Sequence, residues 1–255
     1  MTGTAKHLVR SAGPSIAIAL IVVVANVLAF SPGLGGAFFF DDLPAIVTNE
    51  SLRHLGQPSR VLWPEKDLPV AGRPLANLSL AINYHFHQLR PWGYRATNLS
   101  IHCLSALTLF LLIRRLARSD ISSAPVRAAA IPLALIISLI WSLHPLQSES
   151  VLYATQRTEL VVGLMMLLTL YTLVRARQSP TARFAGVWSG LSVLACLLGM
   201  FCKEVMFFAP VLVLLVDRAF FHSSYADVFR RHARYYLALG LCWIPIVAIL
   251  ATRSE

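Results

Sequence analysis

Two adjacent carboxylates, Asp41 and Asp42, stand directly after Phe38-Phe39-Phe40, where the first apolar part of the chain meets a polar segment. A charged group beside a bilayer is costly enough that it usually has a function, so the pair predicts a catalytic or ligand-binding site. The Leu43-Pro44 that follows also fits ordinary turn chemistry. A solvated turn therefore remains open as the alternative interpretation of this pair.

A second polar cluster lies in the 144–150 connection and just after it. If this segment is a continuous helix, four polar residues at positions i, i+4, i+7 and i+8 share one face, which is costly against lipid and is expected to line a cavity. They are Glu149, Tyr153, Gln156 and Arg157. A purely structural contact between Glu149 and Arg157 is the alternative. His144 either belongs to this site or has a structural role at the end of the helix before Pro145.

A third cluster, Lys203-Glu204, lies between two apolar segments, where neither residue is favourable in contact with lipid. Lys203 can bind a phosphate as a point charge, and Glu204 can neutralise it when no ligand is bound. A solvated ion pair at a tight helical hairpin explains the same spacing.

The sequence predicts no metal centre. His85 and His87 are two residues apart and point to different faces of a helix, and no HExxH pattern occurs. The four cysteines, Cys103, Cys196, Cys202 and Cys242, have no CxxC spacing. They therefore indicate neither zinc binding nor a disulfide framework.

Composition determines the class of protein. Hydrophobic residues make up 56% of the chain and charged residues 13%, and the mean hydropathy is +0.65. These values exclude a soluble domain and predict an integral membrane protein. The net charge of +10 does not indicate nucleic-acid binding, because the arginines form short clusters between apolar stretches and act as topology signals.

Seven apolar stretches predict an all-α, multi-pass membrane protein with one domain over residues 1–255. They are Ser15–Phe30, Thr97–Ile113, Ala128–Leu143, Val151–Val174, Phe184–Phe201, Val205–Val216 and Tyr235–Ala251. A bilayer span needs about 20 apolar residues, so Val205–Val216 is too short unless it continues through Asp217-Arg218 to Phe221.

Basic residues occupy every second connection between these stretches. They are Lys6 and Arg10, then Arg114, Arg115, Arg118 and Arg127, then Arg175, Arg177 and Arg183, then Arg218, Arg230, Arg231 and Arg234. The positive-inside rule places them and the N-terminus in the cytoplasm. Segments 31–96, 144–150 and 202–204, with all three polar clusters, are then extracytoplasmic. A bacterial inner membrane is the expected location.

The 31–96 connection is long enough to predict structure of its own. Pro32-Gly33 and Gly35-Gly36 break the first helix, and Asn49–Leu55 predicts a short helix. Arg73–Leu89 has a helical apolar pattern but is too polar to span, which suits a helix at the membrane interface.

Several motifs in order resemble the membrane portion of the C-type (GT-C) glycosyltransferases, and most of all bacterial relatives of the transmembrane and tetratricopeptide-repeat (TMTC) O-mannosyltransferases. The motifs are Phe39-Phe40-Asp41-Asp42-Leu43-Pro44-Ala45-Ile46, Arg73-Pro74-Leu75, Gly93-Tyr94-Arg95 with Asn98-Leu99 and His102, His144–Val151 with Gln156-Arg157, and Cys202-Lys203-Glu204. Their order and intervals are more specific than any one of them, and the resemblance covers nearly the whole chain.

The resemblance implies that a hexose such as mannose is transferred, with inversion, from a polyprenyl-phosphate carrier to an extracytoplasmic acceptor. The acceptor would be a protein hydroxyl or a glycan. An acceptor hydroxyl needs a base to take its proton, and Asp41 or Asp42 is positioned to act as that base. Glu149 could orient the acceptor or a cation. The donor phosphate needs cations, and Arg157, Lys203 and Arg73 are candidates.

The remaining substrate-binding candidates are His144, Gln156 and Glu204. The resemblance implies no cofactor beyond the lipid-linked donor and no obligatory metal, although some C-type enzymes use a divalent cation. Relatives usually have more spans and often a C-terminal repeat domain, so we expect the domain to be incomplete at its C-terminus. A non-catalytic scaffold, an inactive truncated copy and a transporter are the alternatives.

Overall fold

The computed structural model describes residues 3–253 of the chain, and the side chains of residues 17–248. Lys6 and Arg10, two of the predicted topology signals, have side chains outside that range. All regular elements among the described residues are helical. The α-helices are α1 (Gly3–Phe30), α2 (Pro58–Leu62), α3 (Pro74–His87), α4 (Pro91–Ala117), α5 (Ala124–Ala128), α6 (Ala130–Ser142), α7 (Gln147–Leu152), α8 (Arg157–Arg177), α9 (Ala182–Met200), α10 (Ala209–Phe221), α11 (Tyr225–Leu241) and α12 (Trp243–Arg253).

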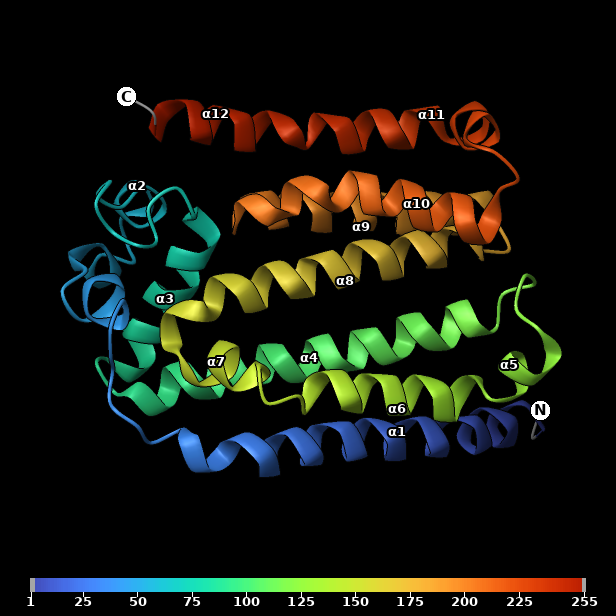
Figure 1. Cartoon of the computed structure of the whole chain (residues 1–255), viewed down its shortest axis with the longest axis horizontal. Coiled ribbons are helices and arrows are strands. Elements are labelled where there is room, and N and C mark those ends of the chain that lie inside the picture. Colours follow the sequence, from blue (N-terminus) through green and yellow to red (C-terminus); the bar gives the residue numbers. More distant parts are fainter. Residues whose placement is uncertain (1–2, 254–255) are drawn as a thin grey trace.

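The long helices run along a common direction, with α4 and α8 in the middle of the bundle (Figure 1). α4 packs against α6 and α8, and α8 packs against α9. The α1–α4 connection, α7 and the start of α8 lie at one end, which we call the loop end. The last turns of α4, α8 and α10 lie at the opposite end, which we call the arginine end.

All seven predicted apolar stretches are helical over most of their length. Three helical segments are long and apolar enough to cross a membrane among the described residues, namely Pro91–Ala117, Ala154–Arg177 and Ala182–Met200. The first of these has 27 residues, which corresponds to about 40 Å at 1.5 Å per residue and exceeds the hydrocarbon core of about 30 Å. Ala17–Gly33 and Ala130–Ser142 are apolar but shorter.

Two predicted spans differ from the helices that form. The short stretch Val205–Val216 begins as a 3-10 turn, and α10 then continues through Asp217 to Phe221. The last stretch is divided, because α11 ends at Leu241 and α12 begins at Trp243. Asp217 can lie inside a helix of the bundle because it is fully buried against a cationic partner, described below.

The 31–96 connection contains several short helices, of which two overlap predicted ones and two, Leu43–Val47 and α2, were not predicted. A 3-10 helix covers Glu50–Arg53, inside the predicted Asn49–Leu55, and α3 covers most of the predicted Arg73–Leu89. These short elements share a small apolar core that includes Ile46, Leu52 and Leu80. The connection is therefore a packed unit at the loop end.

Candidate functional site

The acidic pair lies in a tight turn whose backbone points the two side chains in different directions. Phe40 has a φ of 46°, a left-handed conformation that is uncommon for a bulky residue and often occurs at functional sites. A π-helical turn, Leu43–Val47, follows directly. Asp41 is exposed and Asp42 is fully buried. The two adjacent carboxylates therefore occupy different environments.

Asp42 is bound to the segment that precedes α8. Its Oδ1 accepts hydrogen bonds from the backbone N–H of Thr155 at 2.8 Å and from the Thr155 hydroxyl at 2.6 Å. Asp41 lies next to Tyr153, whose hydroxyl accepts a 2.8 Å bond from the Asp41 backbone N–H. The Tyr153 ring stacks on Phe39 with ring centroids 4.7 Å apart. The backbone of Asp41 is thus held beside the stacked rings of Phe39 and Tyr153, and its carboxylate is exposed.

The predicted continuous helix from Glu149 to Arg157 is wrong. α7 ends at Leu152, Tyr153 is extended, and a 3-10 turn over Ala154–Gln156 leads into α8. A break of this kind leaves backbone carbonyls without helical partners. It also rotates Glu149 away from the face that Arg157 occupies, so the i to i+8 relation does not hold.

Two polar side chains of α4 bind the carbonyls that the break exposes. The Arg95 Nε donates to the Leu152 carbonyl at 2.6 Å, and the Asn98 amide donates to the Tyr153 carbonyl at 3.1 Å. The Arg95 guanidinium also binds the carbonyls of Gly36 and, at 2.5 Å, Ala37. α4 therefore holds together the two loops that carry the acidic pair and its partners.

Arg157 is completely buried at the start of α8. Its Nε donates to Asn98 Oδ1 at 2.5 Å, and one Nη donates to the Tyr94 carbonyl at 2.9 Å. The other Nη lies 3.4 Å from both the carbonyl and the hydroxyl of Ser79. No carboxylate of the described residues forms an ion pair with Arg157, so neutral acceptors alone satisfy this guanidinium.

The third predicted cluster forms two ion pairs at the loop end. Arg73, just before α3, lies 3.5 Å from Glu204. Lys203 forms an ion pair with Glu159, on the first turn of α8. All four side chains are partly exposed, between 22% and 36%. Two cations and two carboxylates therefore sit at the surface, where an incoming anion could compete for the cations.

The acidic pair and the ion-pair cluster are joined by one short segment. Thr155 binds Asp42, and Glu159, four residues later, binds Lys203. Four helical residues span about 6 Å along the axis. Arg157 lies between Thr155 and Glu159 in the chain and is buried, so the segment 155–159 contacts both Asp42 and Lys203.

Other predicted site residues do not join this constellation. Glu149 is exposed on α7, and its side chain has no polar partner in the described part of the chain. The exposed His144 accepts a 3.2 Å bond from the Leu146 N–H, which fits its predicted helix-end role. Gln156 is half-buried. No cluster of three or more metal-ligating side chains occurs among the described residues.

Sequence reasoning missed several residues that build the site. Thr155 and Glu159, the partners of Asp42 and Lys203, were not among the predicted site residues. Arg95 and Asn98 were quoted in a motif without a role. Their spacing of three places them on one face of an otherwise apolar helix, and this signal for buried polar contacts could have been used.

No protein-family model and no solved structure matches the chain. Among curated proteins, it is 27% identical over 215 residues to the protein O-mannosyl-transferase Tmtc3 of Drosophila melanogaster, a match that covers 72% of this chain and 22% of that protein. It is 28% identical over 218 residues to TMTC4 of Mus musculus, covering 78% of this chain and 29% of the relative.

Human TMTC3 is 26% identical over 178 residues, which covers 66% of this chain and 18% of that protein. The chain thus spans less than a third of the length of each of these relatives. The relatives are all named protein O-mannosyl-transferases. The resemblance to the TMTC O-mannosyl-transferases, inferred above from the motifs, is therefore confirmed.

Proposed function

We propose that this protein is a membrane glycosyltransferase that moves a hexose such as mannose from a polyprenyl-phosphate carrier to a protein hydroxyl. The observation that carries the proposal is the division of the acidic pair, with Asp41 exposed beside Tyr153 and Asp42 buried against Thr155. The similarity to protein O-mannosyl-transferases supports the same reaction class.

Asp41 is the general base in this proposal. Its carboxylate takes the proton of the acceptor hydroxyl while the hydroxyl oxygen attacks C1 of the sugar. The bond from C1 to the phosphate oxygen breaks, the phosphate leaves with the electron pair, and attack opposite the leaving group inverts C1. Asp42 is a positioning residue, because it is buried and both donors of Thr155 occupy its Oδ1.

Lys203 and Arg73 are the proposed contacts for the donor phosphate. Both are partly exposed, and both are paired with carboxylates that neutralise them in the absence of ligand. A phosphate offers stronger charge-assisted hydrogen bonds than a single carboxylate oxygen. Glu159 and Glu204 would then be displaced on binding. The two cations supply charge for the departing phosphate, so the proposal needs no obligatory divalent ion.

Arg157 acts below this surface rather than at it. Its donors are occupied by Asn98, Tyr94 and Ser79, so it is assigned a positioning role in place of direct phosphate contact. Its charge has no ion-pair partner among the described residues, and it adds to the positive end of the α8 dipole. Both effects favour an anion near the start of α8.

The loop end is the extracytoplasmic face in this proposal, and the arginine end is cytoplasmic. Segments 31–96 and 202–204 both contact the start of the 154–177 helical segment at the loop end, through the bonds of Asp42 with Thr155 and of Lys203 with Glu159. The lipid-linked donor would approach from the bilayer, and the protein acceptor from the aqueous side. Glu149, His144 and Gln156, at the same end of the bundle, remain candidates for acceptor contacts.

A transfer assay tests the proposal. Membranes that contain the full chain are given polyprenyl-phosphate mannose and a serine- and threonine-rich peptide, and mannosylated peptide is measured. We expect Asp41→Asn to lower the rate by about 10² to 10⁴, because Asn keeps the size but cannot accept the proton. Asp67→Asn is the matched control, since Asp67 is an exposed carboxylate of the same connection.

The proposal is supported if Asp67→Asn transfers mannose at the wild-type rate while Asp41→Asn loses transfer. If Asp41→Asn retains the wild-type rate within about tenfold, the acidic pair has a structural role only. The non-catalytic scaffold would then be the better account of this fold.

A further inference from the structure

A pocket of about 640 Å³ opens at the arginine end, far from the acidic pair. It lies where the last turns of α4, α8 and α10 meet (Figure 1). Arg114 and Arg115 line it from α4, Arg118 lines it from just after α4, and Arg177 lines it from α8. The carboxylate in the lining is that of Asp120. The pocket is therefore strongly cationic.

Arg114, Arg115 and Arg118 have no ion-pair partner among the described residues. They lie within one helical turn of one another, and like charges at that spacing destabilise a helix. The Arg115 Nε is buried and has no hydrogen-bond partner in the described part of the structure. An unpaired buried donor is costly, and an anion bound in the pocket would offer it an acceptor.

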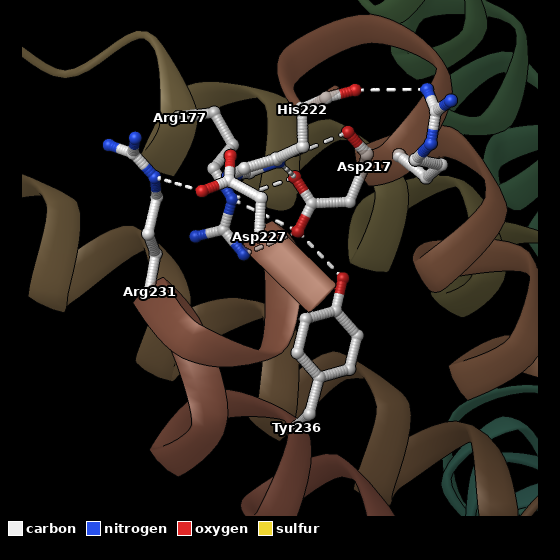
Figure 2. Close-up of polar contacts among 7 residues, drawn as sticks. Arg177, Asp217, His222, Asp227, Arg231 and Tyr236 are labelled. Atoms are coloured by element: carbon white, nitrogen blue, oxygen red, sulfur yellow. Dashed lines mark hydrogen bonds and ion pairs between the residues drawn. The ribbon is translucent and has the colours of Figure 1, made fainter. Parts of the chain in front are cut away.

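Arg177, which lines this pocket, is held in place by a network of polar contacts. Its guanidinium binds Asp217 through an Nε to Oδ1 contact of 2.9 Å and an Nη2 to Oδ2 contact of 2.7 Å. Asp217 also accepts a 2.6 Å bond from the Tyr236 hydroxyl. These three side chains come from α8, α10 and α11 and point toward one another (Figure 2). The network joins α8 to α10 and α11, and so holds together two of the helix ends, those of α8 and α10, that line the pocket.

We propose that this pocket binds a phosphate group, carried by an anionic lipid or by a phosphorylated solute. Guanidinium groups match the geometry of phosphate oxygens, and basic pockets between membrane helices suit lipid headgroups. The half-buried Phe220 and Phe221 form an apolar part of the lining, next to which an acyl chain could lie. The site is separate from the proposed catalytic end and does not depend on the proposed function.

Binding is measured on the purified full chain in phosphatidylcholine nanodiscs. The probes are short-chain phosphatidic acid and, in a separate arm, inorganic phosphate, with affinity measured by native mass spectrometry or by thermal shift. The test variant is Arg114→Gln/Arg118→Gln. The matched control is Arg183→Gln/Arg234→Gln, which removes two exposed charges from the same predicted side but outside the pocket.

We expect phosphatidic acid or phosphate to bind the wild type and the control, and to bind the pocket variant about tenfold more weakly. Binding of phosphatidic acid that inorganic phosphate does not displace identifies a lipid headgroup. Binding of inorganic phosphate with the same variant dependence identifies a phosphorylated solute. If the double variant does not fold, Arg118→Gln alone is used, because Arg118 is exposed.

Two results would overturn the proposal. One is that neither probe binds the wild type more tightly than short-chain phosphatidylcholine does. The other is an equal loss of affinity in the pocket variant and the control, since this indicates general surface charge and not a site.

Discussion

α8 begins at one buried arginine and ends at another, and the two are satisfied in opposite ways. Arg177, at the arginine end, is paired with the buried carboxylate of Asp217, with side-chain exposures of 7% and 0%. Arg157, at the loop end, is bonded to Asn98 Oδ1, to backbone carbonyls and to the Ser79 hydroxyl. The charge of Arg177 is therefore neutralised by a buried carboxylate, while that of Arg157 has no counter-charge among the described residues.

This difference separates a structural from a functional use of the same side chain. The Arg177–Asp217 pair locks three helices and leaves little charge to act on a ligand. The Arg157 charge acts beyond its own contacts, because neutral acceptors orient a guanidinium without neutralising it. In the chain it lies between Thr155, which binds Asp42, and Glu159, which binds Lys203, and the proposed donor phosphate would bring negative charge to this region.

The largest effect on stability is expected at the arginine end of α8. Asp217→Asn leaves Arg177 buried without a counter-charge, and breaking a buried pair in this way costs about 3–5 kcal/mol. Thermal or urea unfolding in detergent measures the loss. Asp120→Asn, at an exposed residue of the same end, is the control and should change stability by less than about 0.5 kcal/mol. A loss below about 1 kcal/mol for Asp217→Asn would mean that the pair does not lock the bundle.

A smaller effect on stability is expected at the loop end of α8. Arg157→Met removes a buried charge that has no counter-charge, and it leaves the Asn98 amide oxygen and two carbonyls with fewer donors. The expected cost is about 1–3 kcal/mol. Arg60→Met, at an exposed arginine of the same end, is the control. A cost as large as that of Asp217→Asn would remove the distinction between the two arginines.

Acid should affect the arginine end selectively. His232 precedes the last predicted span, and burial, together with the nearby Arg177 guanidinium, lowers the pKa of His232 to about 4. Between pH 4 and the ordinary histidine value of about 6.5, the unfolded state binds more protons, so this contribution to stability falls as the pH falls through that window. His232→Asn should reduce the pH dependence of the melting temperature between pH 7 and 5.

His144→Asn, an exposed histidine at the loop end, serves as the control for that experiment. Equal pH dependence in wild type and His232→Asn would assign the acid sensitivity to other groups. His222, whose ring centroid lies 5.1 Å from that of His232, would be tested next.

The sequence was sufficient to predict the all-helical class, and it predicted apolar helices where three helices long enough to cross a membrane form. Periodicity and length carry that information, since each stretch has its own pattern. The break at Tyr153 could not be predicted in the same way. No proline or glycine marks it, and it depends on Arg95 and Asn98, which lie more than 50 residues earlier in the chain.

The candidate site was predicted in its parts and not in its arrangement. The spacing identified the acidic pair, Arg157 and Lys203 as polar groups in an apolar chain. It did not indicate that Asp42 would turn inward, because that depends on the left-handed Phe40 and on Thr155. Nor did it indicate that Arg157 would be covered by Tyr94 and Ser79, since these contacts form only when α3 and α4 pack.

The most direct test of the account separates the chemical step from donor binding in two variants of the loop end. Single-turnover sugar transfer and affinity for polyprenyl-phosphate mannose are measured for Asp41→Asn and Lys203→Gln. We predict that Asp41→Asn lowers the rate at saturating donor by about 10² to 10⁴ and leaves donor affinity nearly unchanged. Lys203→Gln should weaken donor binding by about tenfold or more through loss of a phosphate contact. A saturating rate for Asp41→Asn within about tenfold of wild type would contradict the assignment of Asp41 as the base.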